Sequence, residues 1–94
     1  MPNLSESYTL SLAQQCLATR SADYFLLRES GNIPAMEEAL LSVNGALRTL
    51  ENQPFSEGFR MPRAKLAKDL AMLANWLLTE LLPLTAYRDS GAAL

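Results

Sequence analysis

The side chains that most often carry catalysis or bind metals are scarce in this sequence. Histidine is absent and Cys16 is the single cysteine. Without imidazole the chain lacks the commonest general base and the commonest zinc ligand, and one thiolate cannot build a zinc site. The four glycines stand at positions 31, 45, 58 and 91, too far apart to form a phosphate-binding loop. We therefore predict no catalytic, cofactor-binding or metal-binding residues.

Carboxylate pairs are the remaining groups that could do acid–base chemistry, and their spacing is poor. Glu37 and Glu38 are adjacent, so on a helix they point about 100° apart. Asp69 and Glu80 are separated by about three helical turns. Cys16 falls on an apolar stripe, where a free thiol is usually buried and inert. We expect a protein that is not an enzyme and that has no small-molecule substrate.

Charge is distributed unevenly along the chain. The formal net charge is −2. Residues 1–59 hold three basic and seven acidic residues, a net of −4, and residues 60–94 hold five and three, a net of +2. Half of the basic residues fall within nine positions that contain no acid, namely Arg60, Arg63, Lys65 and Lys68. Cations at the start of a helix oppose its dipole unless an anion compensates. We predict that this cluster steers an acidic partner; the alternatives are neutralisation within the chain and simple solvation.

The last third of the chain carries more apolar residues than one helix face can hold. Besides a regular seam of leucines, a second set lies on other sides of the expected helix: Met72, Trp76, Leu78 and Leu82. A helix that is apolar nearly all round must be covered on more than one side. Trp and Met are also enriched at interface cores. We predict that these four residues form a dimer or partner interface, the alternative being that Trp76 caps the core of a monomer.

Two phenylalanines lie in the segment that joins the second and third helical patterns. Phe55 and Phe59 flank a short polar stretch between Pro54 and Pro62. Binding residues concentrate on loops that a rigid scaffold holds in place. The pair therefore marks a possible recognition loop, and the alternative is a lid that covers the end of the bundle.

Apolar periodicity predicts three helices that would position these residues. The first covers about 4–30, with apolar residues at Leu10, Ala13, Leu17, Tyr24 and Leu27, widened by Leu12 and Cys16. Asn3 and Glu6 have the spacing of a capping box. Gly31 stands where a left-handed residue would end the helix.

The second helix, about 33–52, has the cleanest pattern. Its apolar residues recur at steps of four and three: Met36, Leu40, Val43, Leu47 and Leu50. Pro34 suits a helix start because its missing N–H has no helical partner there. Gly45 lies in the middle at a cost of about 1 kcal/mol relative to alanine. That cost predicts close approach of another backbone, unless the glycine is a tolerated weakness.

The third helix is expected over about 62–82. Its seam consists of Leu66, Leu70, Leu73, Leu77, Leu81 and Leu84. Pro83 removes a backbone hydrogen bond and should kink or end this helix. The tail 89–94 is expected to be frayed.

Together these patterns predict an all-α single domain over 1–94, an antiparallel three-helix bundle that dimerises through its third helix. The rival arrangement is a helical hairpin whose third helix packs on, or is exchanged with, a second subunit. Hydrophobic residues make up 49% of the chain and charged residues 19%, below the roughly 25% of an average domain. Because small domains often need oligomerisation to reach stability, this composition also favours a homodimer.

The sequence gives no sign of a membrane span or a secretion signal. The most apolar stretch, 70–84, is shorter than the roughly 20 residues that a spanning helix needs. Glu80 is its one charge, which also disfavours a helix lying on the membrane surface. A lone cysteine forms no internal disulfide, and the N-terminus lacks a basic and apolar leader. We expect a cytoplasmic protein.

These expectations define a functional hypothesis. The chain is expected to be a non-enzymatic protein-interaction module, such as an adaptor, a chaperone-like protein or an inhibitor. It would act as a helical homodimer that binds another protein. The alternative is a small dimeric nucleic-acid-binding regulator that uses the basic start of the third helix. The acidic net charge disfavours that alternative, as does a connection longer than the turn of a helix-turn-helix.

Overall fold

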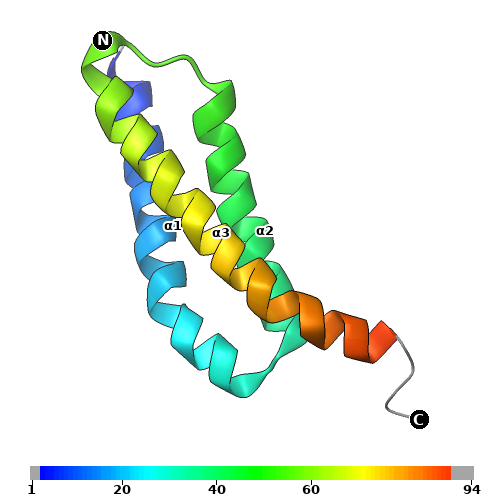
Figure 1. The fold of residues 1–94 in the computed structure, drawn as a ribbon. Helices are drawn as coiled ribbons and strands as arrows, with labels where there is room; N and C mark the ends of the chain where they lie inside the picture. The colour runs from blue at the N-terminus through cyan, green and yellow to red at the C-terminus, as the bar shows by residue number, and fades with distance from the viewer. Residues whose placement is uncertain (1–2, 90–94) are drawn as a thin grey trace.

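The chain folds into three long helices in a computed structural model that describes residues 3–89. α1 is Asn3–Ser30, α2 is Ile33–Asn52 and α3 is Arg60–Asp89, with a short 3-10 helix, η1 (Glu57–Phe59), directly before α3. α1 and α3 run in the same direction and α2 runs in the opposite one (Figure 1). The predicted all-α three-helix bundle is confirmed. Except for Asp89, the tail that was expected to be frayed lies outside the described residues.

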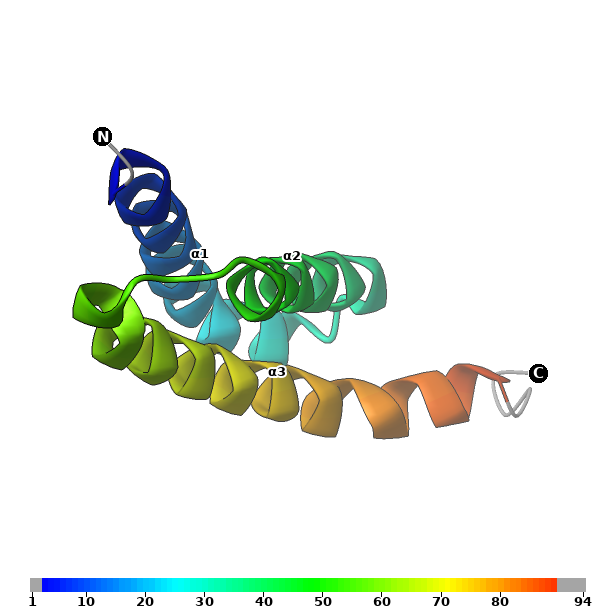
Figure 2. The same cartoon turned by 90° about the horizontal axis from the view of Figure 1, so that it is seen from above.

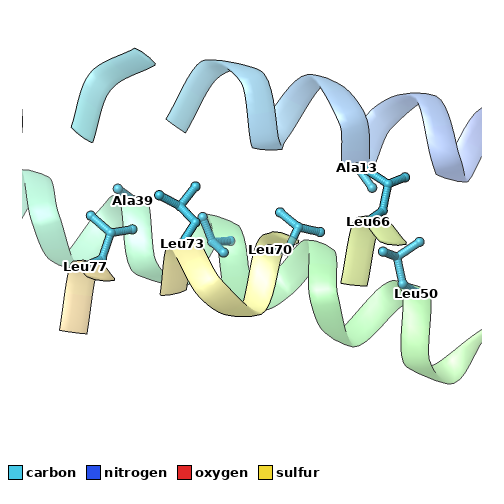
Figure 3. Close-up of a cluster of buried hydrophobic side chains, with 8 residues drawn as sticks. Ala13, Ala39, Leu50, Leu66, Leu70, Leu73 and Leu77 are labelled. Carbon is cyan, nitrogen blue, oxygen red and sulfur yellow. The ribbon is translucent and has the colours of Figure 1, made fainter. Parts of the chain in front are cut away.

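The three helices form two layers. Seen from above, α1 and α2 lie over α3, and the C-terminal end of α3 extends beyond α2 (Figure 2). The most deeply buried side chains come from the α2 and α3 seams and include Met36, Val43, Leu50, Leu70, Leu73 and Leu77. All of these except Met36 meet one another and Ala13 of α1 in a continuous cluster (Figure 3).

α1 is the least deeply buried of the three helices. Ala13 is its one fully buried hydrophobic residue among those described. Leu10, Leu17, Tyr24 and Leu27 are only partly buried against the core. Leu12 was expected to widen the apolar stripe, but its side chain is 47% exposed. α1 therefore leaves apolar surface for another element to cover.

The turn between α1 and α2 follows from two adjacent residues. Gly31 has φ = +62°, and its N–H donates to the carbonyl of Leu27 at 3.1 Å, so it ends α1 as predicted. The side chain of Asn32 caps α2 by accepting a hydrogen bond from the N–H of Ala35 at 3.1 Å. With both helix ends satisfied, the turn needs no further residues.

Gly45 does not mark a close approach of two backbones. It is exposed, and a Cβ added there would meet no atom within 4 Å. Gly45 is therefore a tolerated weak point of α2, as the second alternative predicted. We predict that Gly45→Ala raises the free energy of unfolding by about 1 kcal/mol, because alanine loses less backbone freedom in a helix. Urea unfolding of both proteins at one concentration measures the change, and a lower stability of the alanine variant would contradict it.

Pro83 does not end α3. The helix runs through it to Asp89, seven residues beyond the predicted end, so the predicted end was wrong, whereas the alternative of a kink at Pro83 stays a prediction. Both Pro83 and Thr79, whose carbonyl loses its helical partner, are exposed. Water can therefore satisfy that carbonyl. Leu81 is buried and Leu84 is half-buried, so packing holds the helix together on either side of the proline.

The connection between α2 and α3 is held against the start of α1. Glu6, which was expected to pair with Asn3, accepts hydrogen bonds on its Oε2 from both the N–H and the hydroxyl of Ser56, each at 2.8 Å. The hydroxyl of Thr9 donates to Oε1 of Gln53 at 2.9 Å. These contacts make the connection part of the bundle. The connection is shorter than the interval 52–62 between the predicted helices, because η1 and α3 occupy the second half of that interval.

By length and composition alone, the segment Glu57–Arg88 could cross a membrane, since an 18-residue window within it has a mean hydropathy of 1.2. The core helix of a soluble bundle meets the same criterion, so the finding is weak evidence. In this fold one side of the segment is the leucine seam buried by α1 and α2.

Candidate protein-interaction site

The core does not absorb the apolar content of the chain. Among the residues that the structure describes, ten hydrophobic side chains are buried, whereas eleven large ones are exposed. Single exposed apolar residues are normal on any protein surface. A site is indicated only where several of them gather.

Three aromatic rings gather where α1 lies beside the middle of α3. The Tyr24 ring centroid is 5.5 Å from that of Phe25, edge to face, and 5.8 Å from that of Trp76. Phe25 is 66% exposed and Trp76 is 48% exposed. Met72, 45% exposed, lies one helical turn before Trp76 on the same side of α3. We call these four residues, Tyr24, Phe25, Met72 and Trp76, the aromatic cluster.

Two shallow hollows continue the aromatic cluster along the groove between α1 and α3. The first has a volume of about 240 Å³ and is lined by Leu17, Ser21, Asp69, Met72, Leu73 and Trp76. The second, about 420 Å³, shares Leu17 and Asp69 with the first and reaches Pro62 near the start of α3. On the α1 side its rim is small and polar, formed by Ser7, Ser11 and Gln14. We call the aromatic cluster and these two hollows the α1–α3 face.

A polar contact between α1 and α3 lies at the end of this face nearest to the C-terminus of α1. The Tyr24 hydroxyl donates to Oε1 of Glu80 at 3.2 Å, and Nε of Arg28 lies 3.5 Å from the same oxygen. Burial of the phenol and the nearby Glu80 carboxylate raise the pKa of Tyr24 above its ordinary value of 10.0. The contact joins α1 to α3 and holds the Tyr24 ring against Trp76.

This contact predicts a pH dependence of stability. A raised folded-state pKa means that the neutral phenol is favoured in the fold, so its stabilising effect is full below pH 10 and is lost as the pH rises through the folded pKa. We expect Tyr24→Phe to be less stable than the native chain by about 1 kcal/mol at neutral pH, and this gap to close above pH 10. Thermal unfolding of both proteins between pH 7 and 11 tests this, and a gap that stays constant would contradict it. The other tyrosines are common to both proteins and cancel.

The predicted interface residues divide between two sides of α3. Met72 and Trp76 belong to the α1–α3 face, beside Leu17 and Ser21 of α1. Leu78 and Leu82 are 41% and 57% exposed. At 100° per residue they lie on average about 120° around the helix from the other two. The structure therefore does not bring all four residues into one patch.

The four basic residues are also separated. Arg60 and Arg63 line a hollow at the C-terminal end of α2, whereas Lys65 lines the groove beside α1. Nη1 of Arg63 donates to the carbonyl of Leu50 at 3.5 Å, and its guanidinium carbon lies 5.8 Å from the centroid of the Phe55 ring. A cation at this position donates to a free carbonyl of the last turn of α2, and it interacts favourably with the negative end of the α2 dipole. Arg63 thus has a structural contact, and it is a poor candidate for steering a partner.

The remaining basic residues differ in their partners. Lys65 is 79% exposed, and its Nζ lies 3.6 Å from Oδ2 of Asp69. Arg60 and Lys68 are exposed. Within residues 3–89, Lys68 makes no ion pair. Arg60 likewise makes no ion pair among the described residues, so Arg60 and Lys68 are the two cations of the cluster that are free to meet an acid of another molecule.

The two phenylalanines of the connecting segment lie against the bundle. Phe55 is partly buried and packs on the core, and Phe59 is half-buried in η1. With Ser56 held by Glu6, this segment has the packing that the lid alternative predicts. Met61, two residues beyond Phe59, is 84% exposed.

Cys16 is half-buried between α1 and α2. Its sulfur lies 3.7 Å from the carbonyl of Ser42 and 3.5 Å from the hydroxyl of the same residue. Over the described part of the chain, no three histidine, cysteine or acidic side chains come close enough to hold a metal ion. The thiol therefore has a local partner and no neighbouring ligand set.

Sequence reasoning missed part of the aromatic cluster. It placed Tyr24 in the core and did not single out Phe25, which lies off the apolar stripe of α1. An exposed aromatic residue next to a stripe aromatic is the signal that could have indicated a second contact surface. The proximity of these rings to Trp76 depends on how α1 and α3 are rotated against each other, which the sequence pattern does not define.

Comparison of the chain with protein-family models, with curated proteins and with solved structures found no match.

Proposed function

We propose that this chain is a non-enzymatic protein-interaction module whose working surface is the α1–α3 face. On this face the exposed side chains of Trp76 and Met72 lie beside an open groove. Short polar side chains line the α1 side of that groove. An amphipathic α-helix would fit such a groove, because side chains one turn apart on its apolar face can contact Met72 and Trp76, which are also one turn apart. A bound helix would complete a four-helix arrangement with α1, α2 and α3.

One observation carries this proposal: Trp76, the single tryptophan, is 48% exposed and contacts the Tyr24 ring across two helices. Interface hot spots are enriched in tryptophan and tyrosine, and they lie in pockets ringed by weaker contacts. Met72 and the hollow next to Leu17 supply such a surrounding. The driving force for binding would be removal of this apolar area from water.

Charge would act mainly on the speed of association. Lys65 and Lys68 lie at one end of the face and would attract an acidic partner surface. Arg63 is excluded from this role because it is bound to the end of α2. The alternative is a dimeric nucleic-acid-binding regulator that uses the basic start of α3. Because Arg60 and Arg63 line one hollow and Lys65 lines another, that segment offers a nucleic acid no single basic surface.

A photo-cross-linking comparison tests the proposal. A photoreactive side chain is introduced at Met72 in one protein and at Leu41 in the other, and both are irradiated in the cells of origin. Leu41 is a matched control because it is 73% exposed and lies on α2, outside the face. We expect a discrete adduct from position 72, with a second copy or another protein, that disappears when Trp76→Lys is added. Identical adducts from both positions, or none from position 72, would refute the proposed face.

A further inference from the structure

We infer that Glu80 is a positioning residue: through the hydroxyl of Tyr24 it sets how α1 lies on α3, and it thereby fixes the orientation of Trp76 on the α1–α3 face. The inference concerns contacts within one chain and is independent of the identity of the partner. Only its consequence for binding rests on the proposed function. Glu80 acts through Tyr24 and needs no contact with the partner.

Four side chains form a square between α1 and α3. Tyr24 and Arg28 lie one turn apart on α1, and Trp76 and Glu80 lie one turn apart on α3. The two helices run in the same direction (Figure 1), so the earlier residues of the two pairs meet, and so do the later ones. The ring centroids of Tyr24 and Trp76 are 5.8 Å apart. Nε of Arg28 lies 3.5 Å from Oε1 of Glu80. We call these four residues the contact square.

A diagonal contact makes Glu80 the common acceptor of the contact square. The Tyr24 hydroxyl donates to Oε1 of Glu80 at 3.2 Å, so two donors of α1 converge on one oxygen of α3. Burial of the phenol and the Glu80 carboxylate raise the pKa of Tyr24 above its ordinary value of 10.0, so the hydroxyl keeps its proton at neutral pH. With this hydroxyl held, the Tyr24 ring cannot turn away from the indole without breaking the hydrogen bond.

The apolar stripes alone do not select this alignment of the helices. Apolar side chains repeat along both helices, so a shift of α1 by one turn would preserve much apolar contact. A shift towards the start of α3 would place Tyr24 beside Met72 and Arg28 beside Trp76, and Glu80 would lose both donors. A shift the other way would move Arg28 past the carboxylate. The observed alignment gives Glu80 both donors, and polar contacts between packed helices commonly define register.

The orientation of Trp76 depends on this alignment. Its side chain is 48% exposed, so the buried core holds only part of it. The Tyr24 ring contacts it from α1. An anchor that is already held in its binding orientation loses less conformational freedom on association. Loss of the contact square should therefore weaken binding at the face even though it removes no contact with the partner.

Near-ultraviolet circular dichroism tests the positioning role, because Trp76 is the single tryptophan and supplies the indole signal. Glu80→Ala removes the acceptor and should abolish most of this signal. Glu80→Gln keeps an oxygen that can accept from Tyr24, so it should retain the signal. Tyr24→Phe should lose the same part of the signal as Glu80→Ala, and the double variant should lose no more. Glu38→Ala removes a carboxylate from an exposed position on α2, so it is the control and should match the native chain.

Three results would overturn the inference: a native indole signal in Glu80→Ala, an equal loss in Glu80→Ala and Glu80→Gln, or a further loss when Glu80→Ala is added to Tyr24→Phe. Far-ultraviolet circular dichroism should show native helix content in every variant, because the buried seams are unchanged. A purely structural role of Glu80 would lower the midpoint of thermal unfolding without this dependence on Tyr24.

The adduct formed by a photoreactive side chain at position 72 measures the consequence for binding. Glu80→Ala should lower the adduct yield about two- to tenfold, the range expected when one more side chain must be immobilised on association. Glu80→Gln should restore most of the yield. An unchanged yield in Glu80→Ala would overturn the inferred effect on the face. If the indole signals follow the prediction but the native chain forms no adduct, the proposed function fails and the positioning role of Glu80 stands.

Discussion

Replacing Leu70 by alanine is expected to lower the free energy of unfolding by about 3 kcal/mol. Leu70 is fully buried in α3 and belongs to the cluster that joins all three helices. Truncation removes the transfer free energy of the lost methyl and methylene groups and leaves a cavity that the packed neighbours fill only in part. A domain of this size has a total stability of about 5–14 kcal/mol, so this one change removes a large fraction of it.

Thermal unfolding followed by circular dichroism measures this effect. At about 4–8 °C per kcal/mol for a domain of this size, the midpoint should fall by roughly 12–24 °C. Leu41→Ala is the matched control, because the same substitution at a 73% exposed position should change stability by less than about 0.5 kcal/mol. Both variants should be compared at low concentration, since dimerisation adds to apparent stability. Equal effects at the two positions would contradict the assigned core.

Replacing Trp76 by lysine is expected to weaken association by at least about thirtyfold. Truncation of a hot-spot tryptophan commonly costs about 2 kcal/mol or more of binding free energy, which corresponds to that factor. The lysine adds a charge at the centre of the face, where it would have to lose its water. The fold should persist, because Trp76 is 48% exposed and the buried seam beneath it is unchanged.

Leu41→Lys is the control for this variant. It places the same charge at another exposed apolar position, on α2, and should leave the dissociation constant within about twofold. Sedimentation of the two variants and the native chain over a range of concentrations provides the constants. If both lysine variants associate like the native chain, Trp76 has no part in the interface.

Local periodicity was sufficient to predict the core of α2 and α3. The seams through Val43 and Leu50 and through Leu70 and Leu77 are buried as their spacing requires. A repeat of three and four residues defines which side of a helix is apolar, whatever it packs against. The end of α1 could also be predicted locally, because it depends on one residue, Gly31, which adopts a φ of +62°.

Contacts between distant segments could not be predicted from the same patterns. Glu6 has the spacing of a capping residue, but its carboxylate binds Ser56, 50 residues away. Arg63 was read as part of a basic cluster, but it binds the end of α2. Such assignments depend on how the helices are aligned and rotated, and many alignments satisfy the same apolar stripe. The end of α3 was missed because packing around Leu81 outweighs the loss at Pro83.

The candidate site was predicted in part for the same reason. Trp76 and Met72 stood out as apolar residues beyond the buried seam, and the structure places them together. Leu78 and Leu82 belong to the same helix but to another side, which a count of apolar residues does not distinguish. Phe25 became relevant only when Tyr24 was seen to connect it with Trp76 across α1 and α3.

The proposed function requires that a second polypeptide covers the α1–α3 face. Light scattering coupled to size exclusion, with Trp76 emission recorded from low micromolar to millimolar concentration, tests this most directly. We predict that the mass rises from the 10.4 kDa of one chain towards twice that value, and that the emission shifts to shorter wavelength over the same range as Trp76 loses water. A mass of one chain and an unchanged emission at the highest concentration would contradict self-association through this face.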